Sequence, residues 1–231
     1  MVGKDIFMWS DMMKKTLDIN SLIMEAKLFC EIENSKEYPE LLGITDGKAV
    51  GTFVEHKFKQ YLSEKYFFTN GNSASGIDLP DDFINTDIKV TSIKQPQSSC
   101  PYKDSKQKIF GLGYNLLIFV YDKTDKENTS KLNYLNTTFV KAERTADFTI
   151  TRRLNEMLND GANKEDIISY LSDRAIPGDD ITLNSLADMI IKEKPNQGYL
   201  TISNALQWRL QYGRVISLNN EIEGVINVNF K

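Results

Sequence analysis

The chain has 231 residues, a formal net charge of −4, and a composition that is 41% hydrophobic and 26% charged. These values exclude a low-complexity chain and indicate a globular protein with one large domain, or a core and a smaller lobe. No apolar run approaches the ~20 residues that a membrane span requires. The start of the chain has acids among its bases and no small-residue cleavage site, so we expect no signal peptide.

The chain has few histidines and cysteines, which limits the kinds of catalytic and metal site that it can form. His56 is the single histidine, which excludes a histidine-rich zinc site and a paired-histidine proton shuttle. Cys30 and Cys100 form no CxxC motif, and we expect them to be reduced thiols in a cytoplasmic protein. Acid–base or metal chemistry must therefore come mainly from carboxylates and lysines.

The first part of the chain predicts a sheet with flanking helices. Apolar spacing favours helices over 17–30 and from about 45 to 65. β-Branched and aromatic runs predict strands at 66–69, 76–80, 86–93, 115–121 and 132–142. We therefore expect an α/β (α+β) fold in which residues 1–145 form a mixed central sheet flanked by helices.

The remaining residues, 146–231, predict a helical lobe. Four short helices are expected at 149–158, 163–175, 182–194 and 201–215. Asn163 and Thr182 are the expected N-caps of the second and third of these helices. The final apolar run, VINVNF, predicts a strand that returns to the sheet.

The stretch GIDLPDDFINTDIKVTS, residues 76 to 92, places four aspartates in strand-like surroundings. Read as a hairpin that pairs Pro80 with Asn85, it leaves a four-residue loop. That register sets Asp78 opposite Asp87, with Cβ atoms about 5 Å apart on one face. Lys89 shares that face because strand side chains alternate.

Two carboxylates so close together repel each other unless a cation lies between them. Mg²⁺ takes carboxylate oxygens and keeps several waters, so Asp78, Asp87 and the carbonyl of Ile88 are its expected ligands. Lys89 would stand beside the bound water and the phosphate. These functions are the ones that metal-assisted phosphodiester hydrolysis requires. The alternative is a surface hairpin with a salt-bridged lysine.

An Asp, a spacer and then Asp-x-Lys on the next strand resembles the PD-(D/E)XK nuclease superfamily. Here the pattern is Asp78, eight intervening residues, and Asp87-Ile88-Lys89. The superfamily commonly adds a glutamate from a preceding helix, a place that Glu55 fits; the alternative is an exposed Glu55 paired with Lys59. The pattern departs from the superfamily in that Ile77 precedes Asp78, whereas the literal ProAsp is Pro80-Asp81. Asp81 is therefore the alternative first ligand, but it would need a hairpin centred on Ile84, with no glycine to tighten the turn, so Asp78 is preferred.

The stretches DIKVTSIKQPQSS and QKIFGLGYNLLIFVYD resemble type II restriction endonucleases of that superfamily, over roughly residues 45 to 125. The resemblance implies sequence-specific, Mg²⁺-dependent cleavage of double-stranded DNA, and a partner methyltransferase that protects host DNA. We expect a homodimer, since a palindromic site is most simply read by a two-fold symmetric protein. The alternatives are a structure-specific repair nuclease or resolvase, and a non-catalytic DNA-binding protein with a helix-turn-helix-like reader.

Two stretches without acids, 88–103 and 194–220, are candidate DNA-binding surfaces. On the helix expected at 201–215, Asn204, Gln207 and Arg209 would present groups suited to bases. A solvated helix face is the alternative. The other candidate DNA contacts are Lys94, Gln95, Lys194 and Arg214.

Overall fold

The computed structural model describes residues 14–71, 76–101, 103–203 and 207–230. Its elements follow the order β1 (Lys15–Thr16), α2 (Ile19–Glu33), η1 (Pro39–Leu41), α3 (Gly47–Ser63), β2 (Tyr66–Phe67), β3 (Thr86–Ser92), β4 (Gln97–Pro101), α4 (Lys106–Phe110), β5 (Asn115–Asp125) and β6 (Ser130–Val140). Then come η2 (Ala142–Arg144), α5 (Phe148–Asn159), α6 (Lys164–Asp173), α7 (Asp180–Lys192), β7 (Thr201–Ile202), β8 (Gln207–Gln211), α8 (Gly213–Ile216) and β9 (Val225–Asn229).

A four-stranded sheet in the order β3-β5-β6-β9 is the centre of the fold. The sheet is mixed and flanked by helices, as the sequence predicted. The last strand does return to it, because β9 lies at the edge beside β6. A smaller antiparallel sheet has the order β4-β8-β7, and β1 pairs with β2 in parallel.

The chain groups into two compact units, each built from separate segments. The first contains the described parts of Met1–Gln95, Leu117–Thr137 and Val228–Lys231, and the second contains those of Pro96–Leu116 and Thr138–Asn227. Both units are thus built from discontinuous segments, and neither is bounded simply at residue 145. The division into domains at that residue stays a prediction.

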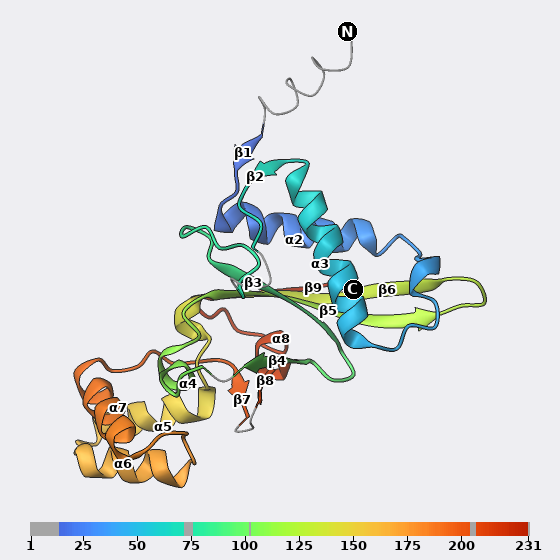
Figure 1. Cartoon of the computed structure of the whole chain (residues 1–231). Coiled ribbons are helices and arrows are strands. Elements are labelled where there is room, and N and C mark those ends of the chain that lie inside the picture. The colour runs from blue at the N-terminus through green and yellow to red at the C-terminus, as the bar shows by residue number, and fades with distance from the viewer. Residues whose placement is uncertain (1–13, 72–75, 102, 204–206, 231) are drawn as a thin grey trace. The chain divides into compact units, whose positions relative to one another are not determined.

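In the first unit, α2 and α3 lie against the sheet (Figure 1). Aromatic side chains join the two helices to each other and to β5. Phe58 of α3 lies 5.1 Å from Phe29 of α2 and 4.9 Å from Phe119 of β5, measured between ring centroids. All three rings are buried. Because these edge-to-face contacts fix the rotation of α3 about its axis, they also determine which of its polar residues face β3.

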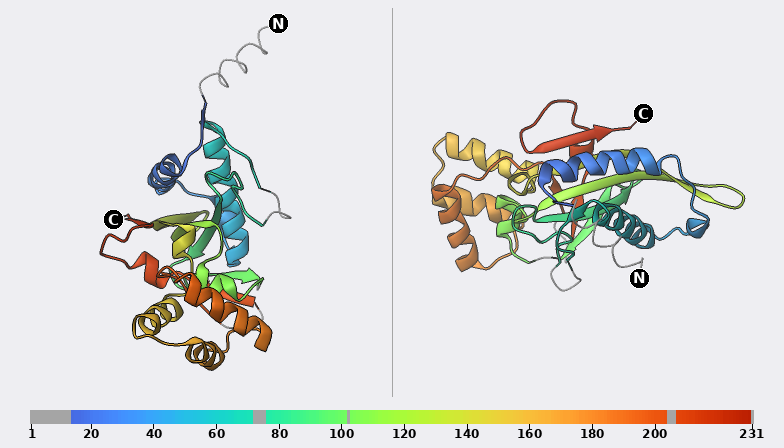
Figure 2. Two further views of the ribbon diagram at one scale, coloured as in Figure 1. Left: turned by 90° about the vertical axis from the view of Figure 1, so that its left-hand side faces the viewer. Right: turned by 90° about the horizontal axis from the view of Figure 1, so that it is seen from above.

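In the second unit, α5, α6 and α7 form a helical group around a hydrophobic cluster (Figure 2). Leu154, Leu171 and Ile190 are fully buried in that cluster, one from each helix. Asn163 caps α6 as predicted, within a reciprocal capping box. The predicted cap at Thr182 is wrong, because Asp179 caps α7 and accepts the Thr182 N–H at 2.8 Å.

The helix predicted over 201–215 is also wrong. Residues 201–202 and 207–211 are strands β7 and β8, and only the short α8 follows them. Trp208, Leu210 and Tyr212 are buried, whereas Arg209 and Gln211 between them are exposed. This period of two is that of a strand with one buried face. The helix-turn-helix-like reader therefore lacks its second helix.

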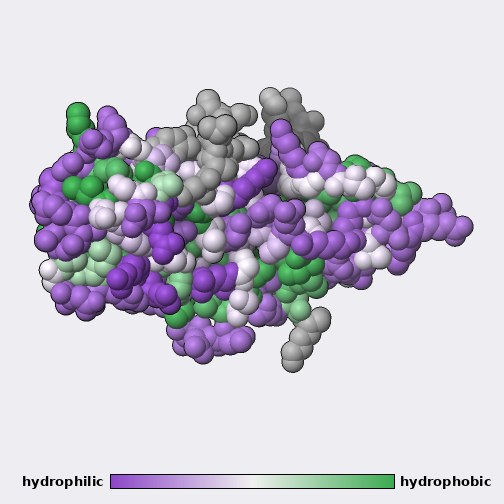
Figure 3. Space-filling view, turned by 90° about the horizontal axis from the view of Figure 1, so that it is seen from below, coloured by the Kyte–Doolittle hydropathy of each residue, from purple (hydrophilic) through white to green (hydrophobic). Residues whose placement is uncertain are grey.

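Neither cysteine forms a disulfide, and both are buried, in agreement with the expected thiols. In the described ranges no helix is both long and apolar enough to cross a membrane. On the face drawn in Figure 3, hydrophilic residues predominate, and the hydrophobic ones gather in small separate patches.

Candidate active site

The predicted register forms, although the strand predicted over 76–80 is wrong, because that stretch contributes a single bridge residue, Leu79. Leu79 and Thr86 form an antiparallel bridge, in which each N–H donates to the carbonyl oxygen of the other at 3.0 and 2.9 Å. This pairing sets Asp78 opposite Asp87. Asp87 and Lys89 lie two residues apart on β3, so their side chains share a face.

The turn of the hairpin uses the other candidate aspartate. The Asp81 carbonyl accepts the N–H groups of Ile84 and Asn85, and Asn85 adopts a positive φ of 35°. The Asp81 carboxylate accepts the N–H of Thr69 at 2.8 Å. Asp81 thus stabilises the loop, and Asp78 is the aspartate that lies opposite Asp87.

Gly71 lies very close to the backbone of Ile77 and Asp78. Its N–H donates to the Asp78 carbonyl at 2.8 Å. A Cβ atom at this position would lie 1.8 Å from the carbonyl oxygen of Ile77. Only glycine permits that approach, so the backbone that carries the Asp78 carboxylate depends on it.

Helix α3 brings two further charged groups to the hairpin. Asp46 caps the helix by accepting the Lys48 N–H at 3.0 Å. At Gly51, α3 lies within van der Waals reach of β3, because a Cβ there would be 3.9 Å from Val90 Cβ. Glu55 and Lys59 follow, one turn apart on one side of the helix.

Lys59 links the helix to the hairpin. Its Nζ donates to Oε1 of Glu55 at 2.8 Å and to Oδ1 of Asp78 at 2.7 Å. The other oxygen of Asp78 accepts the Ile88 N–H at 2.8 Å. Lys89 Nζ lies 2.7 Å from Oδ2 of Asp87. Three acids and two lysines therefore form one connected cluster in the first unit.

The pKa values of the two opposed aspartates are shifted in opposite directions. Asp87 has its pKa raised to about 7 from the ordinary 3.8, chiefly by burial and also by its hydrogen bond with Asp78, although the charge of Lys89 lowers it. Burial would raise the pKa of Asp78 as well, but hydrogen bonds from Asp87 and Lys59 outweigh burial and lower it. At neutral pH or below, Asp87 donates and Asp78 accepts, because two such close carboxylates do not ionise together.

This donor set fits a hard divalent ion. The proton that Asp87 retains because of its raised pKa already reduces the repulsion between the Asp78 and Asp87 carboxylates. Positive charge is therefore favourable at this position. Ile88 adds its carbonyl oxygen, because the N–H and C=O of one strand residue point to the same edge and its N–H faces Asp78. Across the described residues no three His, Cys, Asp or Glu side chains gather as a ligand group. A pair of carboxylates suits Mg²⁺, which keeps several waters.

The structure brings Asp78, Asp87, Ile88 and Lys89 together as predicted, and Glu55 joins them through Lys59. The prediction missed Lys59 as part of the site. Its signal was present in the four-residue spacing from Glu55, which was read only as a pairing on the helix surface. Lys59 makes that pair and a second one with Asp78. His56 is exposed on α3.

The candidate DNA contacts are scattered. Lys94 and Gln95 are exposed in the turn after β3. Lys194 donates to Oδ1 of Asn159 at 2.7 Å, and the Arg214 guanidinium lies 3.7 Å from the centre of the Phe148 ring. Asn204 and the side chain of Gln207 lie outside the described residues. Arg209 is exposed on β8.

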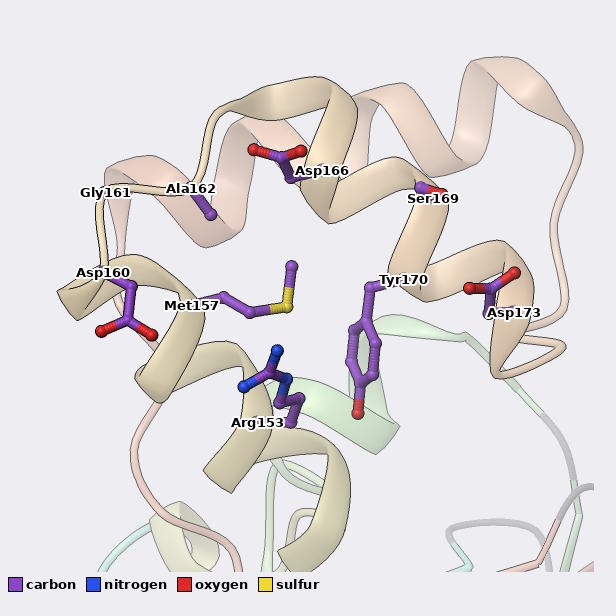
Figure 4. A pocket seen from close by; sticks show the side chains of 9 residues that line it. All are labelled: Arg153, Met157, Asp160, Gly161, Ala162, Asp166, Ser169, Tyr170 and Asp173. Atoms are coloured by element: carbon purple, nitrogen blue, oxygen red, sulfur yellow. The ribbon is translucent and has the colours of Figure 1, made fainter.

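A hollow of about 500 Å³ lies within the second unit, between α5 and α6. Figure 4 shows Arg153, Met157 and Tyr170 pointing into it. Its lining also includes Asp160, Asp166 and Asp173. Three carboxylates against one guanidinium do not suit a phosphate, so the hollow is no candidate for contact with a DNA backbone.

Comparison with known proteins assigns the family. The sequence model of the family described as type II restriction enzyme NspV matches residues 16–227. The chain belongs to the NspV family of type II restriction enzymes. A curated relative from a Nostoc species, also described as type II restriction enzyme NspV, is 55% identical over 214 residues, which cover 92% of this chain and 96% of the relative. No solved structure matches the chain. The acid–lysine cluster lies within the span that the NspV family model matches.

Proposed function

We propose that this member of the NspV family is a type II restriction endonuclease that hydrolyses both strands of duplex DNA at a short specific sequence. Family membership over residues 16–227 supports the class of activity. The observation that carries the chemistry is the pair of opposed carboxylates, Asp78 and Asp87, with the Lys89 ammonium 2.7 Å from the second of them.

Asp78, Asp87 and the Ile88 carbonyl are the proposed ligands of Mg²⁺. When bound, the ion would polarise the scissile phosphate and lower the pKa of a coordinated water. The Lys89 side chain is 22% exposed, so it reaches both the buried Asp87 and an entering substrate. We assign it to orienting the attacking water and stabilising the charge that develops on the phosphate. Water then forms a new P–O bond as the ester bond breaks.

Glu55 is the proposed auxiliary acid, and Lys59 its link to the ligand set. Lys59 Nζ contacts both Glu55 and Asp78, so it fixes the Asp78 carboxylate relative to α3. It also keeps Asp78 ionised while Asp87 holds its proton. We therefore assign Lys59 a positioning role, through which α3 and the hairpin act as one frame.

The arrangement favours membership of the PD-(D/E)XK superfamily. An Asp, then Asp-Ile-Lys on the next strand, and a glutamate from a preceding helix lie in the order of that motif. Ile77 stands where that motif has a proline, and the Gly71 N–H binds the backbone of the next residue through the Asp78 carbonyl.

Further expectations accompany this assignment. A homodimer would match the two-fold symmetry of a palindromic site. A cognate DNA methyltransferase would protect host DNA, and the cytoplasm is the proposed location because the substrate enters there. Each of these is a proposal from the family resemblance.

Plasmid digestion in Mg²⁺ and in EDTA tests the proposal. Discrete bands in Mg²⁺, with no cleavage in EDTA, are the expected result, and sequencing of the fragment ends would give the site. Smears, or cleavage restricted to branched DNA, would instead indicate a structure-specific nuclease. Retarded but uncut plasmid would indicate a binding protein without catalysis.

A further inference from the structure

The small sheet β4-β8-β7 has one buried face and one polar face. Directly opposed residues in antiparallel strands share a face. Cys100 is paired with Trp208, and Ile202 with Leu210, and all four are buried. These four buried side chains anchor the sheet within the second unit. They leave the alternate residues of each strand on the other face.

That other face presents hydrogen-bonding side chains from all three strands. Gln97 is opposite Gln211, which is in turn opposite Thr201, and Ser99 is opposite Arg209. Arg209, Gln211 and Thr201 are exposed, and Ser99 is half-buried. We call these five residues the polar ribbon. It contains no apolar side chain and no carboxylate.

Arg209 is the charged centre of the polar ribbon. Its guanidinium donates to the Ser99 hydroxyl, which lies beside it on β4. The β8 backbone at Arg209 is also tied down, because its N–H donates to the Ser203 hydroxyl and its carbonyl accepts the Ser203 N–H, each at 3.1 Å. Within the described ranges no acid pairs with the guanidinium. The cation is thus held in place and available to a ligand.

These residue types match the edges of DNA bases. Arginine forms two hydrogen bonds with guanine, and glutamine forms two with adenine. Serine and threonine can hydrogen-bond to either base. Arg209 and Gln211, two residues apart on a strand, are separated by about 6.7 Å. That spacing equals about two base-pair steps of 3.4 Å. A major groove about 12 Å wide admits a two-stranded antiparallel ribbon. The antiparallel pair β4 and β8 carries four of the five residues, and Thr201 on β7 is the fifth.

We propose that the polar ribbon reads base edges in the major groove of the recognition sequence, with Arg209 and Gln211 as its principal readers. The inference rests on the proposed function and extends it from cleavage to sequence choice. It replaces the helix predicted over 201–215 as the reading element. A second copy of the chain is the disfavoured occupant, because interface cores are rich in apolar side chains and the ribbon has none.

The test uses Arg209→Lys and Gln211→Ala in the full-length protein, with Arg152→Lys as the matched control. Arg152 is an exposed arginine on α5 that pairs with Glu156, so its variant makes the same chemical change away from the ribbon. Fluorescence anisotropy would measure binding to the cleaved sequence, to each single base-pair change of it, and to unrelated DNA. Ca²⁺ would replace Mg²⁺ in these titrations to prevent cleavage.

We expect Arg209→Lys to lose roughly 5- to 150-fold of the discrimination against other base pairs at one G·C position. Lysine keeps the positive charge but lacks the planar guanidinium that forms bidentate hydrogen bonds. Gln211→Ala should lose a similar factor at an A·T pair. Binding to unrelated DNA should stay unchanged in both, and Arg152→Lys should match the wild type throughout.

Unchanged discrimination in both ribbon variants, with specific cleavage intact in the wild type, would overturn the ribbon while leaving the proposed function standing. An equal loss on all sequences would mean phosphate contact and would overturn base reading. A variant that becomes monomeric in sedimentation would place the ribbon between subunits and would also refute it. A wild type that cuts nothing in Mg²⁺ would instead reject the proposed function.

Discussion

Replacing Asp87 with asparagine should make the protein more stable at alkaline pH and inactive. Asp87→Asn keeps a hydrogen-bonding group opposite Asp78 but removes the second negative charge. An acid whose pKa is higher in the folded than in the unfolded protein destabilises the fold progressively as pH rises between the two values. The wild-type protein without metal should therefore lose stability between pH 4 and pH 7, and the variant should lose less.

The magnitude follows from the shift at Asp87. The pKa rises from 3.8 to about 7. At about 1.4 kcal/mol per pH unit, roughly three units amount to a free energy of about 4 kcal/mol. Asp78 is present in both proteins, and because its pKa depends on the hydrogen bond with Asp87, the difference between their pH profiles reports on the pair.

Urea denaturation in EDTA at several pH values would measure this difference. Asp82→Asn is the control, because it removes an exposed carboxylate from the same hairpin. Mg²⁺ at 100 times its Kd should raise the free energy of unfolding of the wild type by about 2.7 kcal/mol, and that of Asp87→Asn by less. Parallel pH profiles for the wild type, Asp87→Asn and Asp82→Asn would refute the raised Asp87 pKa and the repulsion behind it.

Three further changes test the frame around the site. Gly71→Ala should destabilise the protein by about 1–3 kcal/mol in a thermal melt and slow cleavage, because the new Cβ displaces the backbone at Ile77; an unchanged melting temperature would count against the contact. Lys59→Met should weaken Mg²⁺ binding in calorimetry and slow cleavage, because Lys59 fixes the Asp78 carboxylate and favours its ionised form; unchanged Mg²⁺ binding would contradict this positioning role. Glu25→Gln should destabilise the fold at pH 7, and the deficit should shrink as the pH falls below the ordinary Glu25 pKa of 4.5. Burial would raise the Glu25 pKa, yet hydrogen bonds from Lys65 and Tyr61 outweigh it and lower that pKa, so the Glu25 contribution is present above its unfolded pKa and is lost as acid protonates it. A deficit that does not change with pH in urea titrations would show that the ionised carboxylate is not its source.

Local patterns predicted those parts of the site whose partners are near in sequence. The hairpin register followed from turn length and strand alternation, which act within about fifteen residues. Glu55 and the stripe that buries Val54 and Phe58 followed from helical spacing. Lys59 was missed because its second partner, Asp78, comes from another element. No local pattern reveals such a contact.

The segment over 201–215 was mistaken for a different reason. Leu206 and Leu210 fit a helical period, whereas Trp208, Leu210 and Tyr212 fit a strand period. Pairing with β4, about 110 residues earlier in the chain, decides between them. Intrinsic preference is weak compared with such tertiary pairing. The cap of α7 was likewise misplaced, because Thr182 and Asp179 are both good capping residues.

The most direct test of the catalytic assignment is the comparison of wild type with Lys89→Ala on a short duplex that contains the cleaved sequence. Single-turnover cleavage in Mg²⁺ and binding in Ca²⁺ would be measured on the same DNA. The assignment predicts that Lys89→Ala binds the duplex much as the wild type does but cuts neither strand. Cleavage by Lys89→Ala at the wild-type rate would show that the lysine beside Asp87 has no part in the chemistry.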